Sequence, residues 1–151
     1  IDTAAALAFF EANGISMDSC TNKQLYFEVY NWIGTPYHYA GKSKRGIDCS
    51  GFSCKIYEGV FGTSLLGSSR SIYKTTKPVK LVNAQEGDLV FFKIKKNKIS
   101  HIGIYLQNGK FAHASSSRGV MISDLSESYY KRAFYKVGRL QAAPTLFYFT
   151  N

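Results

Sequence analysis

The pattern of apolar residues changes from helix-like to strand-like along this 151-residue chain, and that change limits the folds available to it. Asp2 predicts the N-cap of a helix over residues 3–12. Thr21 and Gln24 form a predicted capping box for a second helix that runs to Gly34. The first third of the chain is therefore expected to be helical.

The second half carries short β-branched and aromatic runs, separated by clusters of Gly, Asn, Asp and Ser. Strands are predicted over 79–82, 89–94, 99–107, 110–114, 120–123 and 134–140, with a short helix near 127–132. Helices followed by consecutive strands, without regular alternation, indicate an α+β fold with an antiparallel sheet. The length predicts one structural domain.

The charge balance narrows the class of partner. Nineteen Lys and Arg against ten Asp and Glu give a net charge of +9, which attracts polyanionic or carboxylate-rich partners. No zinc-finger, recognition-helix or RNA-binding pattern accompanies the basic residues, so we expect no nucleic-acid partner. The longest apolar run, 4–10, is too short for a transmembrane segment. We expect a monomer.

The cysteine pattern is an odd count of three without CxxC spacing, which indicates neither a zinc site nor a disulfide scaffold. At least one thiol is therefore expected to be free. Cys20 and Cys54 could form a disulfide in an oxidising compartment, and their separate burial is at least as good an alternative.

Cys49 stands where a polar loop becomes the helix-compatible segment 49–59. A helix N-terminus favours the thiolate form of a cysteine, and Gly51 would leave room for a substrate backbone. The plainer alternative is a small buried residue. Cys54 lies one and a half turns further on and is expected to face away from Cys49, into the core.

Two histidines are candidates for the base that a thiol nucleophile needs. His101 and His113 lie in consecutive predicted strands, twelve residues apart. Their side chains share one face only if the connection near Gln107 has an odd count or a bulge. A tight two-residue turn at 108–109 alone would put the imidazoles on opposite faces.

Five short motifs in order resemble the NlpC/P60 family of cell-wall peptidases. They are Gly34-Thr35-Pro36-Tyr37, Asp48-Cys49-Ser50-Gly51-Phe52, Glu86-Gly87-Asp88-Leu89-Val90-Phe91-Phe92, Ser100-His101-Ile102-Gly103-Ile104-Tyr105 and Phe111-Ala112-His113-Ala114-Ser115. The resemblance implies a papain-like fold, with the nucleophile helix packed on a sheet of about five to six strands. It implies a catalytic domain over 30–141, preceded by a helical segment, 1–29, and followed by a tail, 142–151, expected to add a strand.

The resemblance also assigns roles to single residues. Cys49 resembles the nucleophile, His101 the general base and His113 the polar group that orients it, and the hydroxyl of Tyr37 is expected beside the thiol. The expected substrate-binding residues are Asp48, Ser50, Arg70 and Ser100. Of these, Asp48 and Ser50 match positions that help to bind the free amine of a stem peptide's first L-alanine. No metal or organic cofactor is implied.

The activity implied is hydrolysis of peptidoglycan stem peptides or muropeptides, at the bond from γ-D-glutamate to diaminopimelate or lysine. An amidase or acyltransferase on the same fold, and a non-catalytic wall-binding module, remain alternatives. The implied location is the periplasm or cell envelope, after export.

The chain departs from the family pattern in three places. Ala40-Gly41 stands where relatives often have two glycines, and 74–76 (Lys-Thr-Thr) replaces a segment with a glutamine in many relatives. The lysine-rich stretch 93–98 has no counterpart that we can assign.

Overall fold

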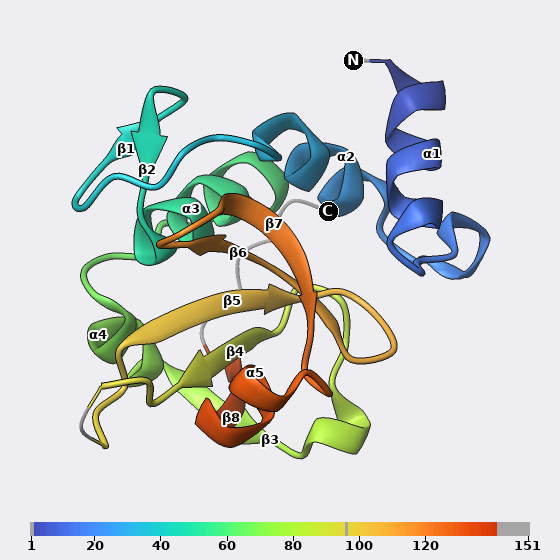
Figure 1. The fold of residues 1–151 in the computed structure, drawn as a ribbon. Coiled ribbons are helices and arrows are strands. Elements are labelled where there is room, and N and C mark those ends of the chain that lie inside the picture. The colour runs from blue at the N-terminus through green and yellow to red at the C-terminus, as the bar shows by residue number, and fades with distance from the viewer. Residues whose placement is uncertain (1, 96, 142–151) are drawn as a thin grey trace.

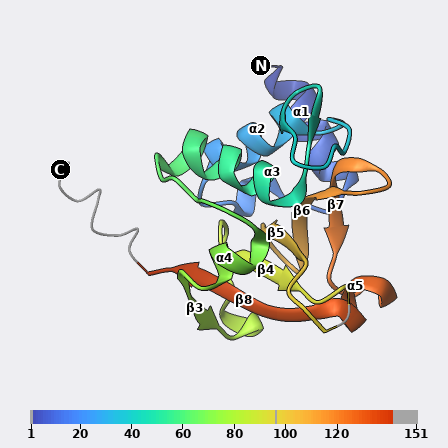
Figure 2. The ribbon, with the colours of Figure 1, turned by 90° about the vertical axis from the view of Figure 1, so that its left-hand side faces the viewer.

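The computed structural model describes residues 2–95 and 97–141. It has a helical layer against one face of a six-stranded sheet, in the order β3-β8-β4-β5-β6-β7, with every neighbouring pair antiparallel. Figures 1 and 2 show α1, α2 and α3 on one side of the molecule and β3, β8 and α5 on the other. The predicted α+β class and strand number are confirmed. The strand expected in 142–151 falls outside the described residues.

Some of the helices begin at the capping residues that the sequence predicts. They are α1 (Thr3–Ala12), α2 (Lys23–Trp32), α3 (Cys49–Ile56), α4 (Ser69–Tyr73) and α5 (Ser128–Ala133), with single turns at Met17–Ser19, Leu81–Asn83 (η3) and, directly after α3, Tyr57–Phe61. Asp2 caps α1 as predicted, by accepting the N–H of Ala5 at 3.1 Å. The 69–73 helix was not predicted.

The predicted capping box at Thr21 and Gln24 is wrong. Asn22 caps α2 instead, because its side chain accepts the N–H of Leu25 at 3.1 Å. The carboxylate of Glu86, distant in sequence, accepts the N–H groups of Thr21 and Asn22 and the hydroxyl of Thr21. A side chain distant in sequence therefore accepts from the residues that were expected to form a local capping box.

Five of the six predicted strands are present, the one predicted over 79–82 is displaced, and the short strands at 42–43 and 46–47 were not predicted. The strands are β1 (Lys42–Ser43), β2 (Gly46–Ile47), β3 (Thr76–Val79), β4 (Leu89–Phe92), β5 (His101–Tyr105), β6 (Lys110–Ser115), β7 (Gly119–Asp124) and β8 (Phe134–Leu140). The strand predicted over 79–82 is displaced, because Thr76–Val79 pairs with β8 at the sheet edge, where Pro78 is tolerated. The next residues form η3 instead.

The core is divided by the sheet. Phe52 and Ile56 of α3 are fully buried and belong to the larger cluster, with Ile102 and Ile104 of β5. A smaller cluster on the other face lies under α5. The helix that begins at Cys49 is thus fixed directly against the strand that begins at His101.

All three cysteines are free thiols in the structure, and the thiol of Cys54 donates to the carbonyl of Leu65 at 3.0 Å. Cys54 packs against the larger core cluster, half-buried, in line with the expected inward position. Among the described residues, no helix is both long enough and apolar enough to cross a membrane.

Candidate active site

The start of α3 is held by one carboxylate. Asp48 Oδ1 accepts the N–H of Gly51 at 2.7 Å, which makes Asp48 the N-cap of the helix that begins at Cys49. Asp48 Oδ2 accepts the N–H of Ala40 at 3.0 Å. A single side chain therefore joins the helix start to the loop that precedes it.

Tyr37 is held near Cys49 by backbone pairing. The N–H of Ile47 donates to the carbonyl of Pro36 at 3.0 Å, and the N–H of His38 donates to the carbonyl of Ile47 at 3.2 Å. Burial raises the pKa of Tyr37, and the negative charge of an ionised Cys49 raises it further. The phenol of Tyr37 is therefore protonated and able to donate a hydrogen bond beside the thiol.

Gly51 is in close contact with the protein's own backbone, which leaves no space for a side chain there. A Cβ at this position would lie 2.7 Å from the carbonyl oxygen of Gly41 and 2.9 Å from Asp48 Oδ1. Gly51 is buried at this contact. The expectation that it leaves room for a substrate backbone is corrected, because the loop over 37–41 already fills that space.

His101 and His113 meet on one face of the sheet. Nε2 of His101 lies 2.8 Å from Nδ1 of His113, and the two rings are nearly perpendicular, at 86°. Strands β5 and β6 pair Ile104 with Ala112 and Tyr105 with Phe111. Continued, this register places His113 opposite residue 103, so the imidazoles meet on a diagonal rather than directly across.

A bulge produces this register. Asn108 and Gly109 both have positive φ, 49° and 78°, and the N–H of Lys110 donates to the carbonyl of Gln107, which makes a tight two-residue turn. The N–H of Leu106 also donates to the carbonyl of Lys110, so two residues oppose one. The turn by itself would separate the histidines, and the extra residue restores the predicted shared face.

Gly103 makes room for the diagonal contact. A Cβ there would lie 2.8 Å from Cδ2 of Phe111 and 3.2 Å from Cβ of His113. Contacts below 3.0 Å are not available to a real side chain without movement of its neighbours. A glycine between the two histidines is therefore a packing requirement of the pair.

Ser123 of β7 extends the pair and was missed by the sequence reasoning. Its Oγ lies 2.8 Å from Nε2 of His113, and its side chain is buried. Strands β6 and β7 pair Phe111 with Ser123 and His113 with Met121, which puts Ser123 and His113 on the same face. The odd-numbered loop between the two predicted strands was a signal that could have identified it.

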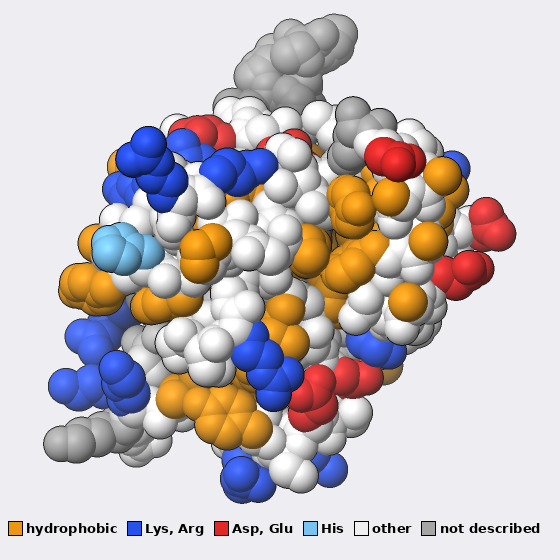
Figure 3. All heavy atoms as spheres, turned by 45° about the horizontal axis from the view of Figure 1, so that its top comes forward, with side chains coloured by type: hydrophobic (Ala, Val, Ile, Leu, Met, Phe, Trp, Pro, Cys, Tyr) orange, Lys and Arg blue, Asp and Glu red, His pale blue; other side chains and the backbone are white. Residues whose placement is uncertain are grey.

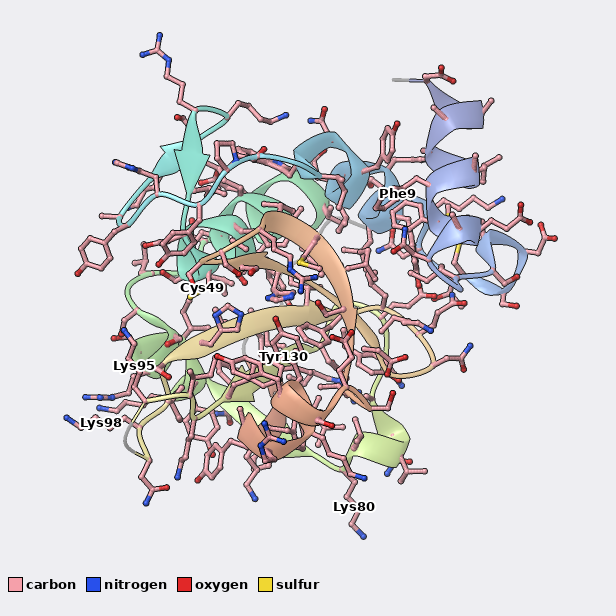
Figure 4. All side chains as sticks on the ribbon, in the orientation of Figure 1. Phe9, Cys49, Lys80, Lys95, Lys98 and Tyr130 are labelled. Carbon is pink, nitrogen blue, oxygen red and sulfur yellow. The ribbon has the colours of Figure 1, made fainter. Side chains whose placement is uncertain are left out.

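These groups line a cleft of about 460 Å³. Cys49, Tyr37, His101, His113 and the expected substrate-binding residue Ser100 all contribute to its wall. The remaining lining residues are Ile94, Lys95, Ser115, Ser116, Ser117, Arg118, Met121, Ser123, Glu127, Tyr129 and Tyr130. In Figure 4, Cys49 lies at the start of α3, with Lys95 and Tyr130 below it in that view.

Three of the expected substrate-binding residues are not among those that line this cleft: Asp48, which holds the start of α3, Ser50 and Arg70. Arg70 is exposed on α4. Ser50 is half-buried and directs its hydroxyl to Asp48 Oδ1 at 3.4 Å. Ser100 lines the cleft but accepts the N–H groups of Ile94 and Lys95, which fixes the loop there. Across residues 2–95 and 97–141, no group of His, Cys, Asp or Glu is arranged to hold a metal ion.

Comparison with known proteins identifies the family of this chain. The model of the NlpC/P60 family matches residues 34–139. The chain belongs to the NlpC/P60 family. This match spans the start of α3, the histidine strands and most of β8.

Three similar proteins illustrate the relationship. A Haemophilus influenzae protein named a probable endopeptidase NlpC homolog is 40% identical over 113 residues, 74% of this chain and 60% of that protein. The Escherichia coli protein named murein DD-endopeptidase MepS/murein LD-carboxypeptidase is 38% identical, over 73% of this chain and 58% of its own. A crystal structure of an NlpC/P60 family protein from Bacillus cereus matches with a TM-score of 0.72 and 28% identity, over 80% of this chain and 40% of that one. The chain thus spans about 60% of the length of these two curated relatives.

Burial favours the uncharged forms of the groups in this NlpC/P60 site. Burial raises the pKa of Cys49 to about 11, although backbone N–H groups of Ile102 and Ser50 oppose the rise. Burial lowers the pKa of His101 to about 4 and that of His113 well below its usual range. Burial therefore opposes the thiolate form that a helix start favours.

We predict that Ala40→Gly stabilises the protein by about 0.5 to 1 kcal/mol. Ala40 has a φ of 62°, a left-handed conformation that is costly for any residue with a Cβ. The backbone N–H that Asp48 accepts is retained in the glycine variant. Urea unfolding measures the change, and Ala5→Gly within α1 is the control, which should destabilise. A loss of stability in Ala40→Gly would contradict the prediction.

We also predict that the free energy of unfolding falls as pH decreases from about 6.5 to 4. The folded pKa of His101 is below its unfolded value, so the unfolded state binds more protons in this range and stability is complete only above it. His101 contributes on the order of 3 kcal/mol, and His113 acts in the same direction. Urea unfolding at several pH values should show a shallower slope in His101→Gln. The exposed His38→Gln is the control and should keep the wild-type slope.

Proposed function

We propose that this chain is a cysteine endopeptidase that hydrolyses peptidoglycan stem peptides. The observation that carries the proposal is the hydrogen bond between His101 Nε2 and His113 Nδ1 in the cleft that Cys49 also lines. Because Nε2 is occupied by His113, Nδ1 is the nitrogen left to receive a proton from the thiol. A nucleophile, a base and an orienting group thus occupy one cleft.

Acylation in this proposal begins from the neutral pair. His101 Nδ1 takes the proton of the Cys49 thiol while the sulfur attacks the scissile carbonyl carbon. The C–N bond then breaks, and the leaving amine takes that proton from His101, which leaves a thioester on Cys49. Water attacks the thioester with His101 as base, the acid product leaves, and the thiol regains its proton.

The tetrahedral intermediate needs donors for its oxyanion. The hydroxyl of Tyr37 and the backbone N–H of Cys49 are the proposed donors, since the phenol stays protonated and Cys49 N–H lies at the unpaired start of α3. His113 stays neutral and accepts from His101 throughout, which stabilises the imidazolium without a second buried charge.

The charge distribution supports a substrate rich in carboxylates. Residues 59–151 hold fourteen of the nineteen cationic residues but only four of the ten acidic ones. On the face shown in Figure 3, Lys and Arg gather mainly on the side of the β1–β2 hairpin, and Asp and Glu mainly on the side of α1. Lys95 and Arg118 line the cleft itself. We therefore expect the chain to act in the cell envelope, where such peptides occur.

The proposed scissile bond joins γ-D-glutamate to diaminopimelate or lysine. The Escherichia coli relative is named for two other activities, DD-endopeptidase and LD-carboxypeptidase, and these make the second candidate. Mass spectrometry of purified muropeptides after digestion distinguishes the three bonds, and would also reveal an amidase or an acyltransferase. Undigested muropeptides that remain bound to the protein would favour a wall-binding module.

Cys49→Ala is expected to lower kcat/KM for a synthetic stem tetrapeptide by at least about a thousandfold, because it removes the nucleophile. Its melting temperature should stay near the wild-type value. Cys54→Ala is the matched control, since its thiol contacts Leu65 outside the cleft, and it should keep wild-type kcat per folded molecule. Near-normal turnover by Cys49→Ala would refute the thiol mechanism.

A second prediction concerns the first residue of the stem peptide. The Asp48 carboxylate accepts two backbone N–H groups, and its remaining lone pairs are the proposed acceptors for the free amine of L-alanine. Wild-type protein should cut the free tetrapeptide about ten- to a hundredfold faster than its N-acetylated form. Asp48→Asn should reduce that ratio toward one. If it slows both peptides equally, Asp48 is only the clamp between helix and loop.

A further inference from the structure

The hydrogen-bonded chain that starts at His101 does not end at His113. Nε2 of His113 lies 2.8 Å from Oγ of Ser123, whose side chain is only 3% exposed. The two imidazoles and the hydroxyl therefore form a continuous buried row across β5, β6 and β7. The protons in such a row must all point the same way, because each neutral imidazole has one donor and one acceptor nitrogen.

Only one of the two proton directions in this row leaves His101 able to act as a base. In the first, His101 Nε2–H donates to His113 Nδ1 and His113 Nε2–H donates to Ser123, which leaves His101 Nδ1 free to accept. In the reverse direction, Ser123 donates to His113, and His113 Nδ1–H donates to His101 Nε2. His101 then carries its proton on Nδ1 and cannot take one from the thiol of Cys49.

We propose that Ser123 is a positioning residue, which accepts from His113 Nε2–H and so holds both histidines in the tautomers that make His101 a base. This rests on the proposed function of His101, although the tautomers can be measured without any substrate. Ser123 does not contact the reacting atoms in this proposal. It acts only through His113.

Ser123 can serve as the acceptor at the end of the row. Its hydroxyl has one proton and two lone pairs, so a lone pair that faces His113 Nε2 leaves the serine proton free to turn elsewhere. Ser123 and Tyr130 both line the cleft, and the ring of Tyr130 packs edge-on against His113, with centroids 5.2 Å apart and an angle of 82°. In the forward direction, each imidazole N–H of the row therefore has an acceptor.

The reverse direction leaves a poor partner at the other end. It would direct His101 Nδ1–H into the cleft that Cys49 lines, where the sulfur of a thiol is only a weak acceptor. The forward direction instead presents an imidazole lone pair to that cleft, which can accept the thiol proton. The end of the row at His101 therefore favours the forward arrangement.

The test is NMR of protein labelled with ¹⁵N-histidine, since long-range ¹H–¹⁵N spectra identify the protonated nitrogen of each ring. In wild-type protein at pH 7, both His101 and His113 should be protonated on Nε2. In Ser123→Ala, His113 should lose this preference, and His101 should become partly protonated on Nδ1. Protonation of His101 on Nδ1 in the wild type, or unchanged tautomers in Ser123→Ala, would overturn the proposal.

Alkylation of Cys49 by iodoacetamide gives a second readout that needs no peptide. At neutral pH, Ser123→Ala should react about three- to thirtyfold more slowly than wild type, because fewer molecules hold a base beside the thiol. The two rates should converge as pH rises toward the pKa of the thiol. An equal loss at every pH would indicate general disruption and overturn the proposal.

Matched variants separate positioning from packing. Ser123→Thr keeps the hydroxyl and should restore the wild-type tautomers. Ser69→Ala removes a buried hydroxyl on α4, outside the cleft, and should leave the tautomers and the alkylation rate unchanged. If Ser123→Ala does not fold, the wild-type spectrum remains the test, because protonation of His101 on Nδ1 in that spectrum overturns the proposal.

Discussion

A β-bulge, in which Leu106 and Gln107 together oppose Lys110, determines whether His101 and His113 can meet. Successive side chains of a strand alternate between faces, so a change of register by one residue would turn His113 away from His101. The tight turn at Asn108 and Gly109 alone would place the two imidazoles on opposite faces of the sheet, and the bulge beside it returns them to the same face. Gly103 then leaves the space in which the two imidazoles meet diagonally. The rest of the hydrogen-bonded row depends on this local geometry.

A second constraint comes from the helical layer. The Asp48 carboxylate joins the start of α3 to the loop that carries Tyr37, by accepting N–H groups from Gly51 and Ala40. This clamp forces Ala40 into a left-handed conformation, and it requires a residue without a Cβ at position 51. The proposed nucleophile and its proposed oxyanion donor are therefore positioned together. The sheet independently positions the proposed base, and the core between α3 and β5 brings the two halves into contact.

Burial gives the site its electrostatic character. An ion pair in the cleft would require two desolvated charges, whereas a thiol beside a row of neutral imidazoles requires none. A neutral row still transmits orientation, because each hydrogen bond fixes the tautomer of the next ring. In the proposed reaction, charge develops only when substrate arrives and the thiol proton moves. The fold thus holds the reacting groups in place before they ionise.

The sequence by itself determined the α+β class, the capping of α1 by Asp2, and the order of motifs that leads to Cys49, His101 and His113. It also set the condition that the connection near Gln107 has an odd count or a bulge, because side-chain alternation is a local property. Only the tertiary structure decided that Glu86 accepts the N–H groups just before α2, that Gly51 fits against Gly41, that Arg70 lies away from the cleft, and that Ser123 completes the row. Those contacts join residues far apart in sequence, and their partners are set by how helix, loop and sheet pack.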